Sequence, residues 1–176
     1  MTGLPVHERI RRTAAVNGGG VAAVAGAFTL YAAFSDGWAL AGFGALATLA
    51  GLMELNGRRL VAERPRAAGI WLQASQLWLF AVIAAYAIWR LAQPDLEPLR
   101  ALLARSLHEY RPLLERLYPG TLPLLERLIA ENHPLLQELL LTSYRYTYGA
   151  LIAVSIFYQG GMWWYYRRRL RELTGA

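Results

Sequence analysis

The chain has 176 residues, of which 56% are hydrophobic and 17% are charged, and its formal net charge is +6. It contains no cysteine, which excludes disulfides, thiolate nucleophiles and cysteine-ligated metals. Its apolar residues come in runs of about 18 or more, which is long enough to cross roughly 30 Å of hydrocarbon. We therefore predict an all-α integral membrane protein rather than a soluble domain.

Four apolar segments are predicted to cross the membrane as helices, with aromatic residues marking the ends of the third and fourth, as is typical at the headgroup level. These spans are expected over residues 16–34, 38–55, about 70–91 and about 146–166. They divide the chain into an N-terminal segment (1–15), three spans with a basic loop at 56–69 (16–92), an outer amphipathic helical subdomain (93–143), and a fourth span with a basic tail (144–176). Small residues in the first two spans predict a tight antiparallel hairpin.

Arginine is concentrated at three places, which are the N-terminal segment, the loop at 56–69 and the tail after the fourth span. With four spans all three lie on one side of the membrane, and the positive-inside bias makes that side cytoplasmic. We therefore expect a bacterial inner membrane protein with both termini in the cytoplasm and the 93–143 subdomain outside or in the periplasm. Because topology accounts for the positive charge, the expected partners are membrane lipid and further copies of the chain or other membrane subunits, and not nucleic acid.

The outer subdomain contains an eleven-residue repeat. Residues 101–144 read ALLARSLHEYR, PLLERLYPGTL, PLLERLIAENH and PLLQELLLTSY, and this period keeps a leucine pair on one side of a helix. The prolines predict a helix over about 96–118 that is kinked at Pro112, a second over about 122–131, and a third that starts after Asn132-His133-Pro134 and continues into the fourth span. The leucine pairs are the candidate assembly surface: Leu102, Leu103, Leu113, Leu114, Leu124, Leu125, Leu135 and Leu136.

Three placements of this leucine stripe stay open. It packs against its neighbours, within the protein or across subunits; it lies flat on the membrane; or it re-enters the membrane and contacts a substrate. Amphipathic eleven-residue repeats separated by prolines resemble those of exchangeable apolipoproteins, and this resemblance implies affinity for lipid surfaces.

A set of polar residues falls near the expected cytoplasmic ends of the spans, and it consists of Asn17, Glu54, Asn56, Gln73, Gln76 and Gln159. Polar groups in lipid are unfavourable, so these residues form the candidate functional site. They line a cytoplasm-facing vestibule for a small solute, or they link the helices by hydrogen bonds. The outer half of the spans has almost no polar residue, which argues against a continuous hydrophilic pore within one subunit.

Catalysis finds little support in the sequence. His108 and His133 stand near acidic residues but lack the spacing of a metal site, so we expect no catalytic, metal-binding or cofactor-binding residue and no cofactor. The topology resembles that of the quinone-reducing disulfide oxidases of bacterial inner membranes. Their chemistry needs cysteine pairs in the outer loops, and this chain has no cysteine, so we reject that function. We therefore predict a non-enzymatic scaffold or accessory subunit of a membrane complex, or a homo-oligomer, assembled through its outer helices. The alternative is a small oligomeric channel or transporter.

Overall fold

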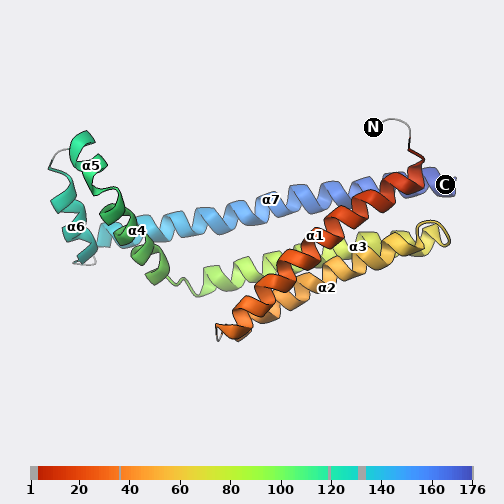
Figure 1. The fold of residues 1–176 in the computed structure, drawn as a ribbon, viewed down its shortest axis with the longest axis horizontal. Helices are drawn as coiled ribbons and strands as arrows, with labels where there is room; N and C mark the ends of the chain where they lie inside the picture. The colour runs from red at the N-terminus through yellow and green to blue at the C-terminus, as the bar shows by residue number, and fades with distance from the viewer. Residues whose placement is uncertain (1–3, 36, 119, 131–133, 176) are drawn as a thin grey trace. The chain divides into compact units, whose positions relative to one another are not determined.

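The computed structural model describes residues 4–35, 37–118, 120–130 and 134–175, and all regular structure in these ranges is helical (Figure 1). In chain order the helices are α1 (Val6–Phe34), α2 (Trp38–Leu60), α3 (Pro65–Ala92), α4 (Glu97–Glu109), α5 (Arg111–Leu117), α6 (Leu122–Ala130) and α7 (Pro134–Thr174). The helices α1, α2 and α3 are long and apolar enough to cross a membrane. The predicted all-α class is therefore confirmed, with three candidate membrane-spanning helices among the described residues.

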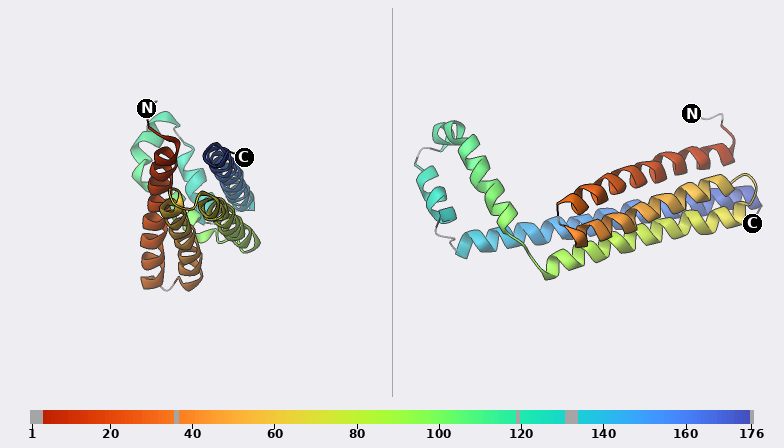
Figure 2. Two further views of the ribbon diagram at one scale, coloured as in Figure 1. Left: turned by 90° about the vertical axis from the view of Figure 1, so that its right-hand side faces the viewer. Right: turned by 60° about the horizontal axis from the view of Figure 1, so that its bottom comes forward.

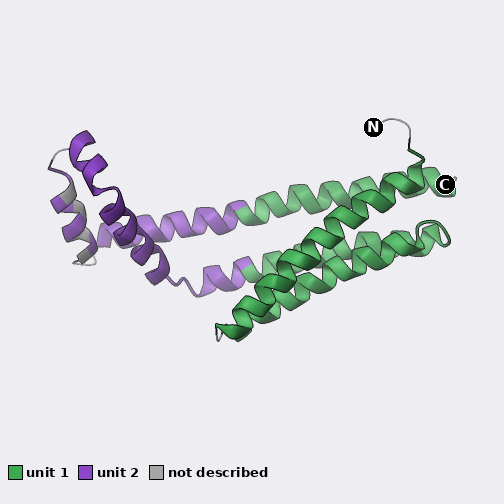
Figure 3. Cartoon of the chain, in the orientation of Figure 1, with its two compact units in different colours: residues 1–86, 151–176 green, residues 87–150 purple. Residues whose placement is uncertain are grey.

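The chain divides into two compact units, one formed by residues 1–86 and 151–176 and the other by residues 87–150 (Figure 3). The first unit contains α1, α2, most of α3 and the C-terminal part of α7. The second contains the end of α3, the three short helices α4 to α6 and the N-terminal part of α7. Two long helices, α3 and α7, thus contribute residues to both units.

In the first unit, α1 and α2 form an antiparallel hairpin (Figure 2). Their backbones approach closely at Gly51 of α2, because a Cβ there would lie 2.6 Å from both the Gly18 carbonyl oxygen and the Ala22 amide nitrogen. Gly44 leaves as little room, since its Cβ would lie 2.5 Å from Thr29 Oγ1. Small residues allow helices to approach this closely, and the observed hairpin agrees with the one predicted from the small residues of the first two spans.

An apolar core lies where the N-terminal part of α1, the turn after α2, the start of α3 and the C-terminal part of α7 meet. Its buried side chains are Ile10, Ala14, Val61, Ala68, Leu72, Tyr166 and Leu170. Away from this core, α2 and α3 are joined by an aromatic contact. Phe43 of α2 packs edge-to-face against Tyr86 of α3, with ring centroids 5.4 Å apart. These contacts hold four helices around the candidate site.

The predicted basic loop at 56–69 is mostly helical, so this prediction was wrong in extent. α2 continues through Asn56 and Gly57, and α3 begins at Pro65, which leaves only residues 61–64 between them. Glycine at position 57 allows α2 to pack closely on α3, because a Cβ added there would lie only 2.8 Å from Leu72 Cγ. Pro65 suits the first position of a helix, where its missing N–H is not required.

The second unit differs from the prediction at Pro112. Instead of one kinked helix over 96–118, α4 and α5 are separate helices that meet at Tyr110. Pro112 lies in the first turn of α5, where a proline displaces no helical hydrogen bond, so the chain starts a new helix rather than bending an old one. α6 begins at Leu122, as the sequence predicts, and α7 begins at Pro134 itself rather than after it. Gly120 adopts a φ of 88° in the turn before α6.

α7 is a continuous helix that includes the predicted fourth span, but it is not among the three helices apolar enough to cross a membrane. Its many tyrosines lower its hydropathy relative to α1, α2 and α3. Two of them join α7 to the end of α3 within the second unit. The Tyr144 hydroxyl donates to the Arg90 carbonyl oxygen (3.1 Å), and Arg90 Nε donates to the Tyr148 hydroxyl (3.2 Å).

Candidate functional site

The carboxyl group of Glu54 is the centre of a buried polar network in the first unit. Glu54 lies on α2, shortly before the helix ends, and is 1% exposed. Asn17 Nδ2 on α1 donates to both carboxyl oxygens, at 2.9 and 2.7 Å. Gln76 Nε2 on α3 donates to Oε2 at 3.0 Å, and the Tyr166 hydroxyl on α7 donates to Oε1. Three donor side chains from three other helices therefore converge on one carboxyl group.

The network extends further along α7 through Tyr158. Its hydroxyl donates to Asn17 Oδ1 at 2.6 Å, which fixes the orientation of the Asn17 amide so that Nδ2 faces Glu54. Tyr158 and Tyr166 are eight residues apart, a spacing that places both on one face of a helix. On α3, Gln76 Nε2 also lies 3.3 Å from Ser75 Oγ. The side chains of all four long helices are thus connected through hydrogen bonds.

The close approach of α1 and α2 places Asn17 next to Glu54. Gly18 follows Asn17 and faces α2 so closely that a Cβ on it would lie 3.0 Å from both Glu54 Cβ and the Gly51 carbonyl oxygen. A larger residue at either glycine would separate the helices and lengthen the Asn17–Glu54 hydrogen bonds. The glycines of the hairpin therefore set the geometry of the polar network.

The carboxyl group of Glu54 has little remaining capacity for a ligand. An ionised carboxylate offers about four acceptor positions, and four hydrogen bonds are donated to this one. Fully paired polar groups rigidify the interior of a protein, whereas an unpaired buried charge is strongly destabilising. The arrangement is that of a group that holds four helices together.

A cavity of about 300 Å³ lies beside the network, between α3 and α7. Its lining is mostly apolar, but the side-chain oxygens of Gln76 and Gln159 are buried and have no hydrogen-bond partner among the described residues. Ser155 Oγ, one turn before Gln159 on α7, is also buried and accepts or donates no hydrogen bond within the part of the chain that the structure describes. Buried polar atoms are nearly always paired, so these three atoms are the unsatisfied part of the site.

The six polar residues selected from the sequence therefore separate into three groups. Asn17, Glu54 and Gln76 meet in the network, and Gln159 lies with Gln76 at the cavity. Asn56 and Gln73 are half-buried and make none of the network's hydrogen bonds. Gln73 instead lines a separate cavity near the start of α3. Two members of the network, Tyr158 and Tyr166, were not selected, although their spacing along one helix face was available as a signal.

The candidate assembly surface lies in the second unit and shows a regular alternation. The first leucine of each pair is exposed, by 60, 52, 58 and 66% for Leu102, Leu113, Leu124 and Leu135 respectively. The second leucine is less exposed in every pair where the structure describes it: Leu103 and Leu114 are half-buried, and Leu136 is buried. The side chain of Leu125 lies outside the described residues.

Within the part of the chain that the structure describes, no group of three or more histidine, cysteine, aspartate or glutamate side chains could hold a metal ion. His133 lies outside that part. Comparisons of this chain with protein-family models, with curated proteins and with solved structures found no match.

Proposed function

We propose that this protein is a non-enzymatic four-span membrane protein that acts as a scaffold or accessory subunit of a membrane complex, or as a homo-oligomer. Assembly takes place through the leucines of the 93–143 subdomain. The 146–166 stretch of α7 is the fourth span in this proposal, which places both termini in the cytoplasm of a bacterial inner membrane. The observation that carries the proposal is the exposed first leucine of all four repeats.

An exposed leucine recurring every eleven residues needs a surface to cover it, because large uncovered apolar patches mark interaction sites or cause aggregation. A covered leucine contributes about 2 kcal/mol. The polar residues of the same segment favour protein over lipid as the covering surface. Residues 93–143 contain five arginines and seven acidic residues, whereas helices that lie on membranes usually carry a basic face.

Replacing the four exposed leucines with serine tests the assembly role. In the variant Leu102→Ser, Leu113→Ser, Leu124→Ser and Leu135→Ser, we expect normal membrane insertion, because these side chains contribute little to burial within the chain. We expect the oligomer or the partner complex to be lost, since each covered leucine contributes about 2 kcal/mol. Detergent-solubilised mass measurement and native gels report the assembly.

The matched control replaces four exposed charged residues of the same helices: Glu109→Ser, Arg116→Ser, Arg127→Ser and Glu138→Ser. It introduces the same number of serines, leaves the net charge unchanged and keeps the leucines. This control should assemble like the wild type. A leucine variant that assembles as well as the control would show that the outer subdomain is not the assembly surface.

Single cysteines test the orientation, because the chain has none of its own. Ala62, in the turn between α2 and α3, and Thr121, in the turn before α6, are both exposed positions. A membrane-impermeant thiol reagent should label Thr121→Cys in intact cells and Ala62→Cys only after permeabilisation. Labelling of both positions from the same side would contradict the four-span arrangement.

The second candidate function is a small oligomeric channel or transporter. The cavity between α3 and α7 favours it, because the oxygens of Gln76 and Gln159 there are available to a solute. The hydrogen bonds that fill the acceptor positions of Glu54 argue for the structural role, because a transport site has to exchange partners. Flux through the purified protein separates the two functions.

A further inference from the structure

A second cavity, of about 420 Å³, lies between the first turns of α3 and the last turns of α7. Three arginines line it, Arg66 from α3 and Arg167 and Arg171 from α7, and none of the described residues that line it is acidic. All three side chains are exposed. Several positive charges thus surround a single hollow in the first unit.

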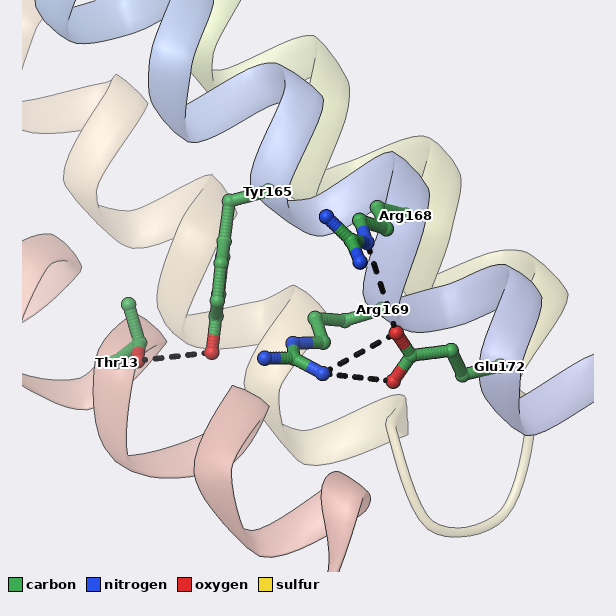
Figure 4. Close-up of polar contacts among 5 residues, drawn as sticks. All are labelled: Thr13, Tyr165, Arg168, Arg169 and Glu172. Atoms are coloured by element: carbon green, nitrogen blue, oxygen red, sulfur yellow. Dashed lines mark hydrogen bonds and ion pairs between the residues drawn. The ribbon is translucent and has the colours of Figure 1, made fainter. Parts of the chain in front are cut away.

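The arginines of this cavity differ from their neighbours in forming no ion pair with an acidic residue that the structure describes. Glu172 is paired with Arg168 at 3.8 Å and with Arg169 at 2.8 Å (Figure 4). Among the described residues, no carboxylate makes an ion pair with Arg66, Arg167 or Arg171. Arg167 lies over the ring of Trp163, with its Cζ 5.1 Å from the ring centroid. Three guanidinium groups that line one cavity and form no ion pair with a described carboxylate repel one another, and an anion in the cavity relieves that repulsion. Glu172 lines a neighbouring cavity with Arg167 and Arg171, but its carboxylate is paired with Arg168 and Arg169.

The shape and lining of the cavity select a kind of anion. Guanidinium groups form paired hydrogen bonds with phosphate oxygens. Leu170 and Ile70 add an apolar wall, and Gly69 at the same place has no side chain to fill the space. A phosphate ester with an attached apolar group therefore fits this lining better than a small inorganic anion does.

The position of the cavity indicates the source of the phosphate. It lies at the beginning of α3, which is apolar enough to cross a membrane, and aromatic residues precede the arginines on α7. Tryptophan followed by arginine is typical of the level where lipid headgroups lie. Basic pockets between membrane helices bind anionic headgroups, and each arginine near the surface adds to the attraction. We propose that this cavity binds the phosphate group of an anionic phospholipid. The proposal rests on membrane insertion and not on the assembly role.

Native mass spectrometry of the detergent-solubilised protein tests the proposal, with phosphatidylglycerol and phosphatidylcholine as probes. We expect one phosphatidylglycerol to remain bound preferentially, because the choline ammonium of the second lipid is repelled by the guanidinium groups. In the variant Arg66→Gln, Arg167→Gln and Arg171→Gln, the affinity for phosphatidylglycerol should fall by roughly 10- to 100-fold.

The matched control is Arg58→Gln, Arg59→Gln and Arg64→Gln, which removes three arginines around the turn between α2 and α3 without altering the cavity. It should retain the lipid as the wild type does. Equal binding of the two lipids, or equal losses in the two triple variants, would overturn the proposal. Glycerol 3-phosphate is the probe for a soluble source: competition at millimolar concentration by this compound would assign the phosphate site to a soluble ester and overturn the lipid assignment.

Discussion

Replacing Glu54 with leucine is expected to be among the most destabilising single substitutions in this protein. The variant removes the carboxyl acceptor of Asn17 Nδ2, Gln76 Nε2 and the Tyr166 hydroxyl. Gln76 and Tyr166 are buried and Asn17 is half-buried. Each buried group that loses its partner costs about 1–3 kcal/mol in proteins generally, and a hydrogen bond between membrane helices contributes about 0.6 kcal/mol on average and up to about 1.7 kcal/mol. We expect a loss of about 3 kcal/mol, measured as a shift of the SDS-induced unfolding midpoint in mixed micelles.

Glu63→Leu is the matched control, because Glu63 is exposed in the turn after α2 and takes part in none of the network's hydrogen bonds. It should change the unfolding free energy by less than about 0.5 kcal/mol. Flux in reconstituted liposomes gives a second measurement on Glu54→Gln, which keeps the shape of the side chain. A wild-type conductance that disappears in this variant, with assembly intact, would favour the channel over the scaffold.

The sequence predicted the membrane-compatible helices because apolar run length is a local property of the chain. Asn17, Glu54 and Gln76 could also be selected, since a polar residue inside an apolar run is conspicuous without any structure. Their partners on α7 were harder to select, although the two tyrosines share one helix face. Tyr158 and Tyr166 stand among other aromatic residues near a predicted span end, where tyrosine already has an explanation at the headgroup level.

The helix ends were harder to predict, because packing decided them. Asn56 and Gly57 read as a loop in isolation, but α2 continues through them since Gly57 packs on Leu72 of α3. The division at Tyr110 was missed for a different reason. A proline inside an amphipathic pattern is compatible with a kink or with a new helix, and the periodicity of the leucines is the same in both cases. Local patterns therefore predicted which segments are helical better than where each helix ends.

Gly51→Ala is the second substitution with a large expected effect, although it adds only one methyl group. The new Cβ would lie 2.6 Å from two backbone atoms of α1, the Gly18 oxygen and the Ala22 nitrogen. Backbone atoms cannot rotate away as a side chain does, so α1 and α2 must separate. Overpacking of this kind costs about 1–3 kcal/mol, and the separation also lengthens the hydrogen bonds between Asn17 and Glu54. We expect a lower SDS-induced unfolding midpoint.

Gly42→Ala on the same helix is the matched control, because a Cβ at Gly42 lies in open space, with no described atom within 4 Å beyond its chain neighbours and the nearby backbone of α2. Alanine is the better helix former by up to about 1 kcal/mol, so this variant should be as stable as the wild type or more stable.

Combining Gly51→Ala with Glu54→Leu tests the connection between the hairpin and the network. If the glycine acts by positioning Asn17 against Glu54, the double variant should lose less unfolding free energy than the sum of the two single losses. The reason is that Glu54→Leu removes hydrogen bonds that Gly51→Ala has already weakened. Full additivity would show that the tight approach of α1 and α2 stabilises the protein independently of the polar network.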